Sequence, residues 1–169
     1  MDFLKKNLVK LLIGAVMLTA AVFALILIIN SFEFMGAKGY KELIPTANKS
    51  GITGTLLVCI GIFIGALCAL IAVIISMLGK DNVSAYILIG AGLLAVILIV
   101  VGMIVGAKAV KSMADTIKAL KKAGETKSLT YKSTVWNYNT TVFKNIFFLI
   151  TFGCAPAIFG LKKLFEKSK

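Results

Sequence analysis

The fold of this chain is decided by residues 55–107, which read TLLVCIGIFIGALCALIAVIISML at 55–78, GKDNVS at 79–84 and AYILIGAGLLAVILIVVGMIVGA at 85–107. Each apolar run is long enough to cross the hydrocarbon core of a bilayer, which takes about 20 residues of helix. Neither run contains a charged residue. The connection is short and polar, so we expect a tight helical hairpin, with Ser84 as the N-cap of its second helix.

Two further apolar runs flank this hairpin. Residues 11–29 follow three lysines and contain Thr19 as their one clearly polar member, so a secretory signal peptide is a competing interpretation. The uninterrupted length favours an uncleaved signal anchor, because the apolar part of a signal peptide measures about 7–15 residues. Residues 142–161 contain Pro156, which membrane helices tolerate with a kink. We favour a fourth span here over a re-entrant or surface-lying segment.

The composition agrees with a membrane protein. Of the 169 residues, 59% are hydrophobic and 15% are charged, and the mean hydropathy is +0.97. The connections are too short for a soluble module. We therefore predict an all-α membrane protein, a four-transmembrane-helix bundle of tetraspan-like layout, in which the whole chain (1–169) is a single membrane domain with spans at approximately 11–29, 55–78, 85–107 and 142–161.

The third apolar run continues into a basic segment. Val110, Met113 and Ile117 recur at helical spacing while lysines fill the other face, so we expect a basic amphipathic extension of the third helix that stops near Gly124. Residues 129–142 are rich in Thr, Tyr, Val and Trp. This composition is typical of a β-strand and fits equally an extended approach to the membrane, and the sequence leaves both open.

We expect a multi-pass protein of the cell membrane, and the lysines bear on its orientation. Four spans put eight lysines on the side of the termini and ten on the other, so the positive-inside rule is nearly balanced. The first helix usually sets the orientation, and Lys5, Lys6 and Lys10 flank it. We expect cytoplasmic termini.

Several classes of function are disfavoured by what the sequence lacks. It contains no histidine and no arginine, and Cys59, Cys68 and Cys154 lie inside apolar runs without metal-ligand spacing. We therefore expect no enzyme activity, no catalytic residues, no metal or organic cofactor and no nucleic-acid partner. The central parts of the four runs also lack charged residues, which argues against ion-coupled transport but leaves a passive pore open.

Two GxxxG motifs lie at membrane depth, Gly61/Gly65 in the second run and Gly102/Gly106 in the third. Glycines four residues apart on one helix face let two backbones approach closely, which is how membrane helices associate. We expect these four residues to be helix-packing sites. The glycine faces serve either packing within one bundle, which we favour, or self-association.

A lipid-surface site is expected after the third run. Lysines near a membrane attract anionic headgroups, and tryptophan prefers the interface. A solvated loop with an aromatic belt is an equally good interpretation. The candidate lipid-surface residues are Lys108, Lys111, Lys118, Lys121, Lys122 and Trp136.

The function that follows is a small multi-pass membrane protein that acts by helix packing and assembly. Its expected partners are the lipid bilayer with its anionic headgroups and either copies of itself, in a homo-oligomer, or a larger membrane protein to which it is an accessory subunit. A passive channel or transporter component is the alternative.

Overall fold

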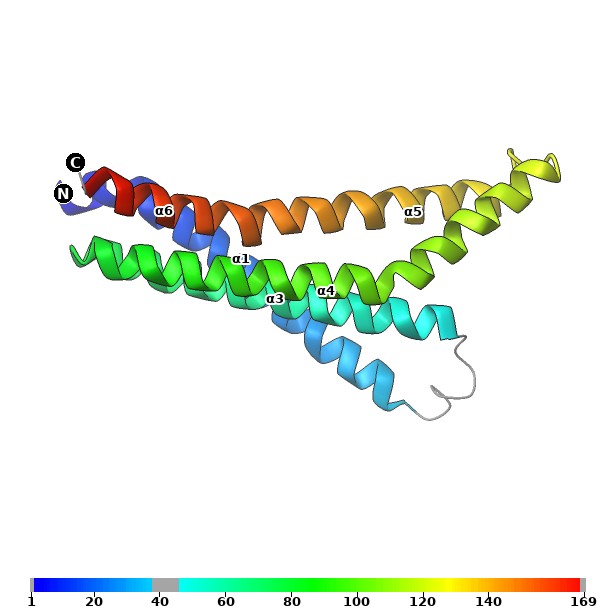
Figure 1. The fold of residues 1–169 in the computed structure, drawn as a ribbon, viewed down its shortest axis with the longest axis horizontal. Coiled ribbons are helices and arrows are strands. Elements are labelled where there is room, and N and C mark those ends of the chain that lie inside the picture. Colours follow the sequence, from blue (N-terminus) through cyan, green and yellow to red (C-terminus); the bar gives the residue numbers. More distant parts are fainter. Residues whose placement is uncertain (1, 38–45, 168–169) are drawn as a thin grey trace.

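The computed structural model describes residues 2–37 and 46–167, which are helical apart from short turns (Figure 1). Side chains are described for 7–37 and 48–166. α5, the π-helical stretch η1 and α6 follow one another without a break and form one long helix. The elements in chain order are α1 (Asp2–Gly36), α3 (Thr46–Met77), α4 (Asp81–Lys122), α5 (Leu129–Phe148), η1 (Leu149–Cys154) and α6 (Ala155–Lys167).

Four helical segments are long and apolar enough to cross a membrane: Asn7–Gly36, Asn48–Met77, Asp81–Lys122 and Leu129–Glu166. Each contains one of the expected apolar runs, except that Leu78 lies just past the end of α3. Every segment also extends beyond its run, since helical hydrogen bonding continues into the flanking polar residues. The continuation of the third helix is the longest, and α4 ends only at Lys122.

α3 and α4 form the centre of the helix bundle, and each packs against one further helix on its outer side. These two helices run antiparallel through the centre, α1 packs on α3, and the α5–α6 helix packs on α4 (Figure 1). Both ends of the chain lie at the same end of the molecule as the turn between α3 and α4 (Figure 1). A central cluster of buried side chains joins α1, α3, α4 and η1, and consists of Ala21, Ala24, Val58, Ile62, Ala66, Ile99 and Phe152.

One stripe of α1 faces α3. Asn7, Gly14, Ala21 and Ala24 are buried, at spacings of seven and three residues. Such spacing keeps side chains on one face of a helix that crosses its neighbour at a shallow angle. A Cβ at Gly14 would lie 3.5 Å from the side chain of Leu70, so the stripe is in van der Waals contact with α3.

α3 and α4 approach each other with their backbones in contact. A Cβ at Gly54 would lie 2.6 Å from the carbonyl oxygen of Gly102, and a Cβ at Gly102 would lie 2.7 Å from the carbonyl oxygen of Gly54. No other residue fits at such a crossing without movement of a helix. Close backbone approach brings many atoms within dispersion range, and this is the main attraction available between helices in lipid.

The expectation of a strand or an extended segment at 129–142 is wrong, because these residues form most of α5. Ser128 caps the helix, with its Oγ accepting a hydrogen bond of 3.1 Å from the backbone N–H of Tyr131. Inside the helix, the hydroxyls of Thr134 and Thr140 donate to carbonyls one turn back, at 2.7 Å each. These bonds satisfy hydroxyls that otherwise favour non-helical backbone, and α5 also contacts α4 although none of its residues is buried.

The expectation that Ser84 caps the third helix is also wrong. α4 begins at Asp81, its N-cap is Lys80, and the connection from α3 is only 78–80. Ser84 lies one turn inside the helix and is fully buried. The expected stop at Gly124 agrees with the structure, since α4 ends two residues earlier and Gly124 has a φ of 78°, a conformation that glycine adopts without strain.

The π-helical stretch ends two residues before Pro156. Proline has no N–H, so the carbonyl of Phe152 lacks its α-helical donor. That carbonyl lies against α3, where a Cβ at Gly65 would be 2.5 Å from it. Gly65 therefore makes room for the backbone of η1. In α6, Gly160 makes room for the backbone of α4, because a Cβ at Gly160 would lie 2.6 Å from the carbonyl oxygen of Ala85.

Candidate functional site

A cleft of about 540 Å³ opens between α1 and α6 at the end of the molecule where the termini lie. Because α1 packs on α3 and α6 packs on α4, α3 and α4 form its floor. We call it the α1–α6 cleft. Its lining is mostly apolar with a cationic rim, and includes Lys10, Ile13, Met17, Ala69, Ala72, Val73, Ser76, Ser84, Leu88, Thr151, Ala155, Pro156, Phe159, Lys162, Lys163 and Glu166.

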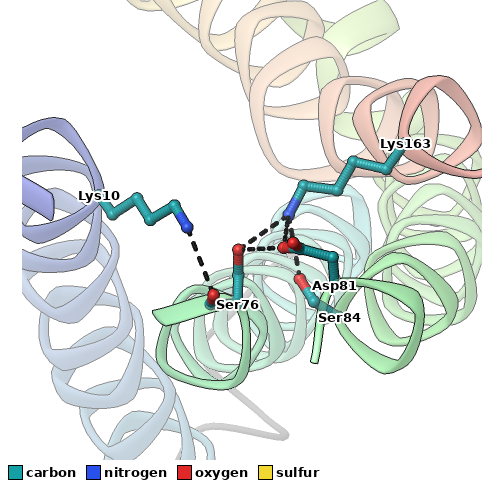
Figure 2. A network of polar contacts seen from close by, with 5 residues as sticks. All are labelled: Lys10, Ser76, Asp81, Ser84 and Lys163. Carbon is teal, nitrogen blue, oxygen red and sulfur yellow. Dashed lines mark hydrogen bonds and ion pairs between the residues drawn. The ribbon is translucent and has the colours of Figure 1, made fainter. Parts of the chain in front are cut away.

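A polar network lies at one end of this cleft and ties α6 to the α3–α4 turn (Figure 2). The ammonium of Lys163 lies 3.6 Å from Asp81 Oδ1 and donates to the hydroxyls of Ser76 at 3.2 Å and Ser84 at 3.3 Å. Ser76 Oγ in turn donates to Asp81 Oδ1 at 2.6 Å. We call these four residues, Ser76, Asp81, Ser84 and Lys163, the α6 latch.

Ser76 also connects the latch to α1. Figure 2 shows Lys10 and Lys163 reaching toward Ser76 from opposite sides, and Lys10 Nζ donates to the Ser76 carbonyl oxygen at 3.3 Å. This carbonyl lies in the last turn of α3, where helix carbonyls carry partial negative charge, and it also accepts a hydrogen bond of 3.2 Å from the backbone N–H of Gly79. One serine therefore makes contacts with three other helices, α1, α4 and α6.

The latch satisfies polar groups that the fold buries. Ser76 and Ser84 are 5% and 0% exposed, and a buried hydroxyl without a partner costs about 1–3 kcal/mol. The side chains of Lys163 and Asp81 are 35% and 39% exposed, so water still screens their attraction. The network thus positions α6 mainly through hydrogen bonds to buried serines.

A second cavity of about 550 Å³ lies at the opposite end of the molecule, among α1, α3, α4 and α5. Amides and hydroxyls contribute to its wall, including Asn30, Asn48, Thr55, Thr141 and Asn145. The central cluster lies between the two cavities, since Met17 lines the first, Met103 lines the second, and both pack against that cluster.

The four predicted helix-packing glycines all face other helices of the same chain. A Cβ at Gly61 would lie 2.8 Å from Ile99 Cγ1, and Gly65 and Gly102 meet backbone as described above. Gly106 is looser, with Gly54 Cα at 3.8 Å from its Cβ position. The glycine faces are therefore occupied by intramolecular packing in this structure.

The predicted lipid-surface residues lie at the other end from the latch. Lys108, Lys111, Lys118, Lys121 and Lys122 are all exposed on the last four turns of α4, and Trp136 is 70% exposed on α5. They lie on the hairpin of α4 and α5, which extends beyond the end of the apolar run and which we call the basic hairpin (Figure 1). The structure does not bring them together with the α1–α6 cleft.

Sequence reasoning missed the latch. The connection at 79–84 was expected only as a tight polar turn, but its Asp81 bonds to Ser76 and Lys163. The available signal is that Asp81 is the one acidic residue between Glu42 and Asp115, with a serine five residues before it and another three residues after it. An isolated carboxylate between two apolar helices needs a cation, and Lys163 follows the last apolar run on the same side.

A scan of protein-family models finds no match to this chain, and searches of curated proteins and of solved structures return none either.

Proposed function

We propose that this chain is a four-span protein of the cell membrane, a single membrane domain with cytoplasmic termini, that acts without catalysis by assembling with other membrane proteins. It does so as a homo-oligomer or as an accessory subunit of a larger complex. The basic hairpin of α4 and α5 would lie on the far side of the membrane, against anionic headgroups. The observation that supports assembly is the exposed apolar outer face of α1.

α1 packs chiefly on one helix, α3, and 17% of its most apolar window is buried, the same share as in the last spanning helix. The side turned away from α3 carries large apolar residues, among them Val16 and Phe23, which are 63% and 64% exposed. Because the glycine faces of α3 and α4 are occupied within the chain, this outer face of α1 is the surface we assign to a partner helix. A partner there would cover the apolar face of α1 that no helix of the chain covers among the described residues.

Cysteine crosslinking in native membranes tests this assignment. In a chain with Cys59, Cys68 and Cys154 replaced by alanine, Val16→Cys and Phe23→Cys place thiols on the outer face of α1. Ile97→Cys, 57% exposed on α4, is the matched control. We expect crosslinked products from the α1 positions and none from the control, and their masses distinguish a second copy from a larger partner. Equal products from all three positions, or none, would contradict the proposal.

A passive channel or transporter component is the second candidate, favoured by the two cavities that the central cluster separates. In such a conduit Phe152, which is 7% exposed, would act as part of the barrier. Release of a trapped dye from proteoliposomes should then rise in Phe152→Ala relative to the parent chain. If neither releases the dye faster than empty liposomes, this candidate is excluded.

A further inference from the structure

The α1–α6 cleft combines an apolar interior with cations placed at one level of the molecule. Lys10 directly precedes the apolar run at 11–29, and Lys162 directly follows the run at 142–161. Lysines at the ends of apolar runs lie where the hydrocarbon core meets water. We propose that this cleft binds one anionic phospholipid of the leaflet on the termini side, with an acyl chain in the cleft and the headgroup phosphate between Lys10 and Lys162.

The walls fit an acyl chain. The volume of about 540 Å³ falls within the range of roughly 300–1,000 Å³ that is usual for small-molecule cavities. Ile13 and Phe159 stand on opposite walls and are 44% and 62% exposed, so the apolar lining is open to the surrounding lipid. Below the level of the lysines, Met17, Val73 and Leu88 offer no group that would hold a soluble anion. This arrangement selects a lipid over free phosphate.

The cations on the rim differ in how fully they are engaged. Lys163 is committed to the α6 latch, where Asp81 balances its charge. Lys10 has the Ser76 carbonyl as its partner, and an ammonium with three N–H donors retains two for a phosphate. Lys162 lies 3.7 Å from Glu166, and both side chains are about two-thirds exposed (65% and 63%), so this pair is weak and yields to a fixed phosphate. The rim therefore keeps a positive charge that an anionic headgroup matches and a zwitterionic one does not.

This inference rests on the insertion of the helices in a bilayer, and it is independent of the assembly proposed above. A monomer that binds no partner still has the cleft, and a chain that assembles through α1 can still leave it empty. The two proposals therefore fail separately.

Native mass spectrometry of the full chain, released from a neutral detergent, measures the binding. Palmitoyl-oleoyl phosphatidylglycerol is titrated against palmitoyl-oleoyl phosphatidylcholine, which has the same acyl chains, and against glycerol phosphate, which has none. We expect one phosphatidylglycerol per chain, bound more tightly than phosphatidylcholine, and no competition from glycerol phosphate. Equal affinity for the two lipids, or full competition by glycerol phosphate, would overturn the proposal.

Substitutions locate the site. Lys10→Gln should weaken phosphatidylglycerol binding by about fivefold, and Lys10→Gln with Lys162→Gln by about 25-fold, given the usual contribution of one lysine near an anionic surface. Lys80→Gln is the matched control, because Lys80 is exposed at the same end of the molecule but outside the cleft. Ile13→Trp fills the cleft from an exposed position and should abolish the binding of both lipids. A loss in Lys80→Gln as large as that in Lys10→Gln, or unchanged binding in Ile13→Trp, would show that the lipid binds elsewhere.

Discussion

Because α3 and α4 cross in close contact, alanine substitutions at three glycines of α4 should differ in their effect on stability. Gly90, Gly102 and Gly106 all lie within α4 and differ in what a methyl group would meet. A Cβ at Gly102 would be 2.7 Å from the Gly54 carbonyl oxygen and 2.9 Å from both the backbone nitrogen and the Cγ2 of Val58. At Gly106 the nearest atom is 3.8 Å away, and at Gly90 no described atom lies within 4 Å.

The same substitution should therefore have opposite effects along this helix. Glycine to alanine in a helix interior gains about 1 kcal/mol from the lower backbone entropy of the unfolded chain. Gly90→Ala and Gly106→Ala should show this gain. Gly102→Ala gains the same amount but forces two backbones apart, and overpacking of a well-packed interior costs about 1–3 kcal/mol. We expect Gly102→Ala to be less stable than Gly90→Ala by about 1–3 kcal/mol.

Thermal unfolding in a mild detergent, followed by circular dichroism and by the fluorescence of Trp136, measures these differences. Each kcal/mol corresponds to a shift in Tm of about 2–4 °C for a chain of this size. The expected order of Tm places Gly90→Ala and Gly106→Ala above Gly102→Ala. A Tm of Gly102→Ala equal to that of Gly90→Ala would mean that α3 and α4 are not in backbone contact, and the packing argument would be wrong.

Three further predictions concern the α6 latch, the turn between α4 and α5, and the membrane topology. Lys163→Gln should lower the free energy of unfolding by about 1–2 kcal/mol in the same melting assay, because the buried serines lose a charged donor. The control Lys162→Gln should change the free energy of unfolding by less than about 0.5 kcal/mol, because its ion pair is exposed. Similar losses in both variants would contradict the structural role of the α6 latch. Gly124→Ala should lower the free energy of unfolding by about 1 kcal/mol, since a φ of 78° disfavours a side chain. A gain in stability would show that the turn between α4 and α5 adopts another backbone conformation. Single cysteines at Asp2, Lys41 and Lys167, probed with a membrane-impermeant thiol reagent on whole cells, should label from outside only at position 41; labelling of the first and last positions alone would reverse the orientation.

The four apolar helices could be predicted because their physics is local. A long apolar segment must satisfy its backbone hydrogen bonds within itself once it leaves water, so hydropathy alone predicts a helix. The stop at Gly124 was equally local, because the backbone conformation that ends α4 there suits glycine. The helix at 129–142 was missed for the converse reason. Its Thr, Tyr and Val content is typical of strands, but such preferences reflect packing in sheets, and here the neighbour is α4.

The α6 latch and the α1–α6 cleft could not be predicted from the sequence, because both depend on contacts between residues far apart in the chain. Ser76 and Asp81 are five residues apart, but Lys163 is 87 residues further along than Ser76, and the contact exists only because the α5–α6 helix packs along α4. The direction in which α6 presents its lysines depends on every residue before it. The sequence therefore shows that Lys163 follows an apolar run without identifying its partners.

The π-helical stretch η1 has a consequence for the evolution of the chain length. A π-helical turn holds one residue more than an α-helical turn, so η1 is where the α5–α6 helix carries a surplus residue. Removal of one residue within Leu149–Cys154 takes out this surplus residue, so Phe148 and Gly160 can keep their present neighbours. A deletion elsewhere in this helix rotates everything beyond it by about 100°. Natural or designed variants of this protein should therefore tolerate a one-residue length change at η1 better than at any other point of the last helix.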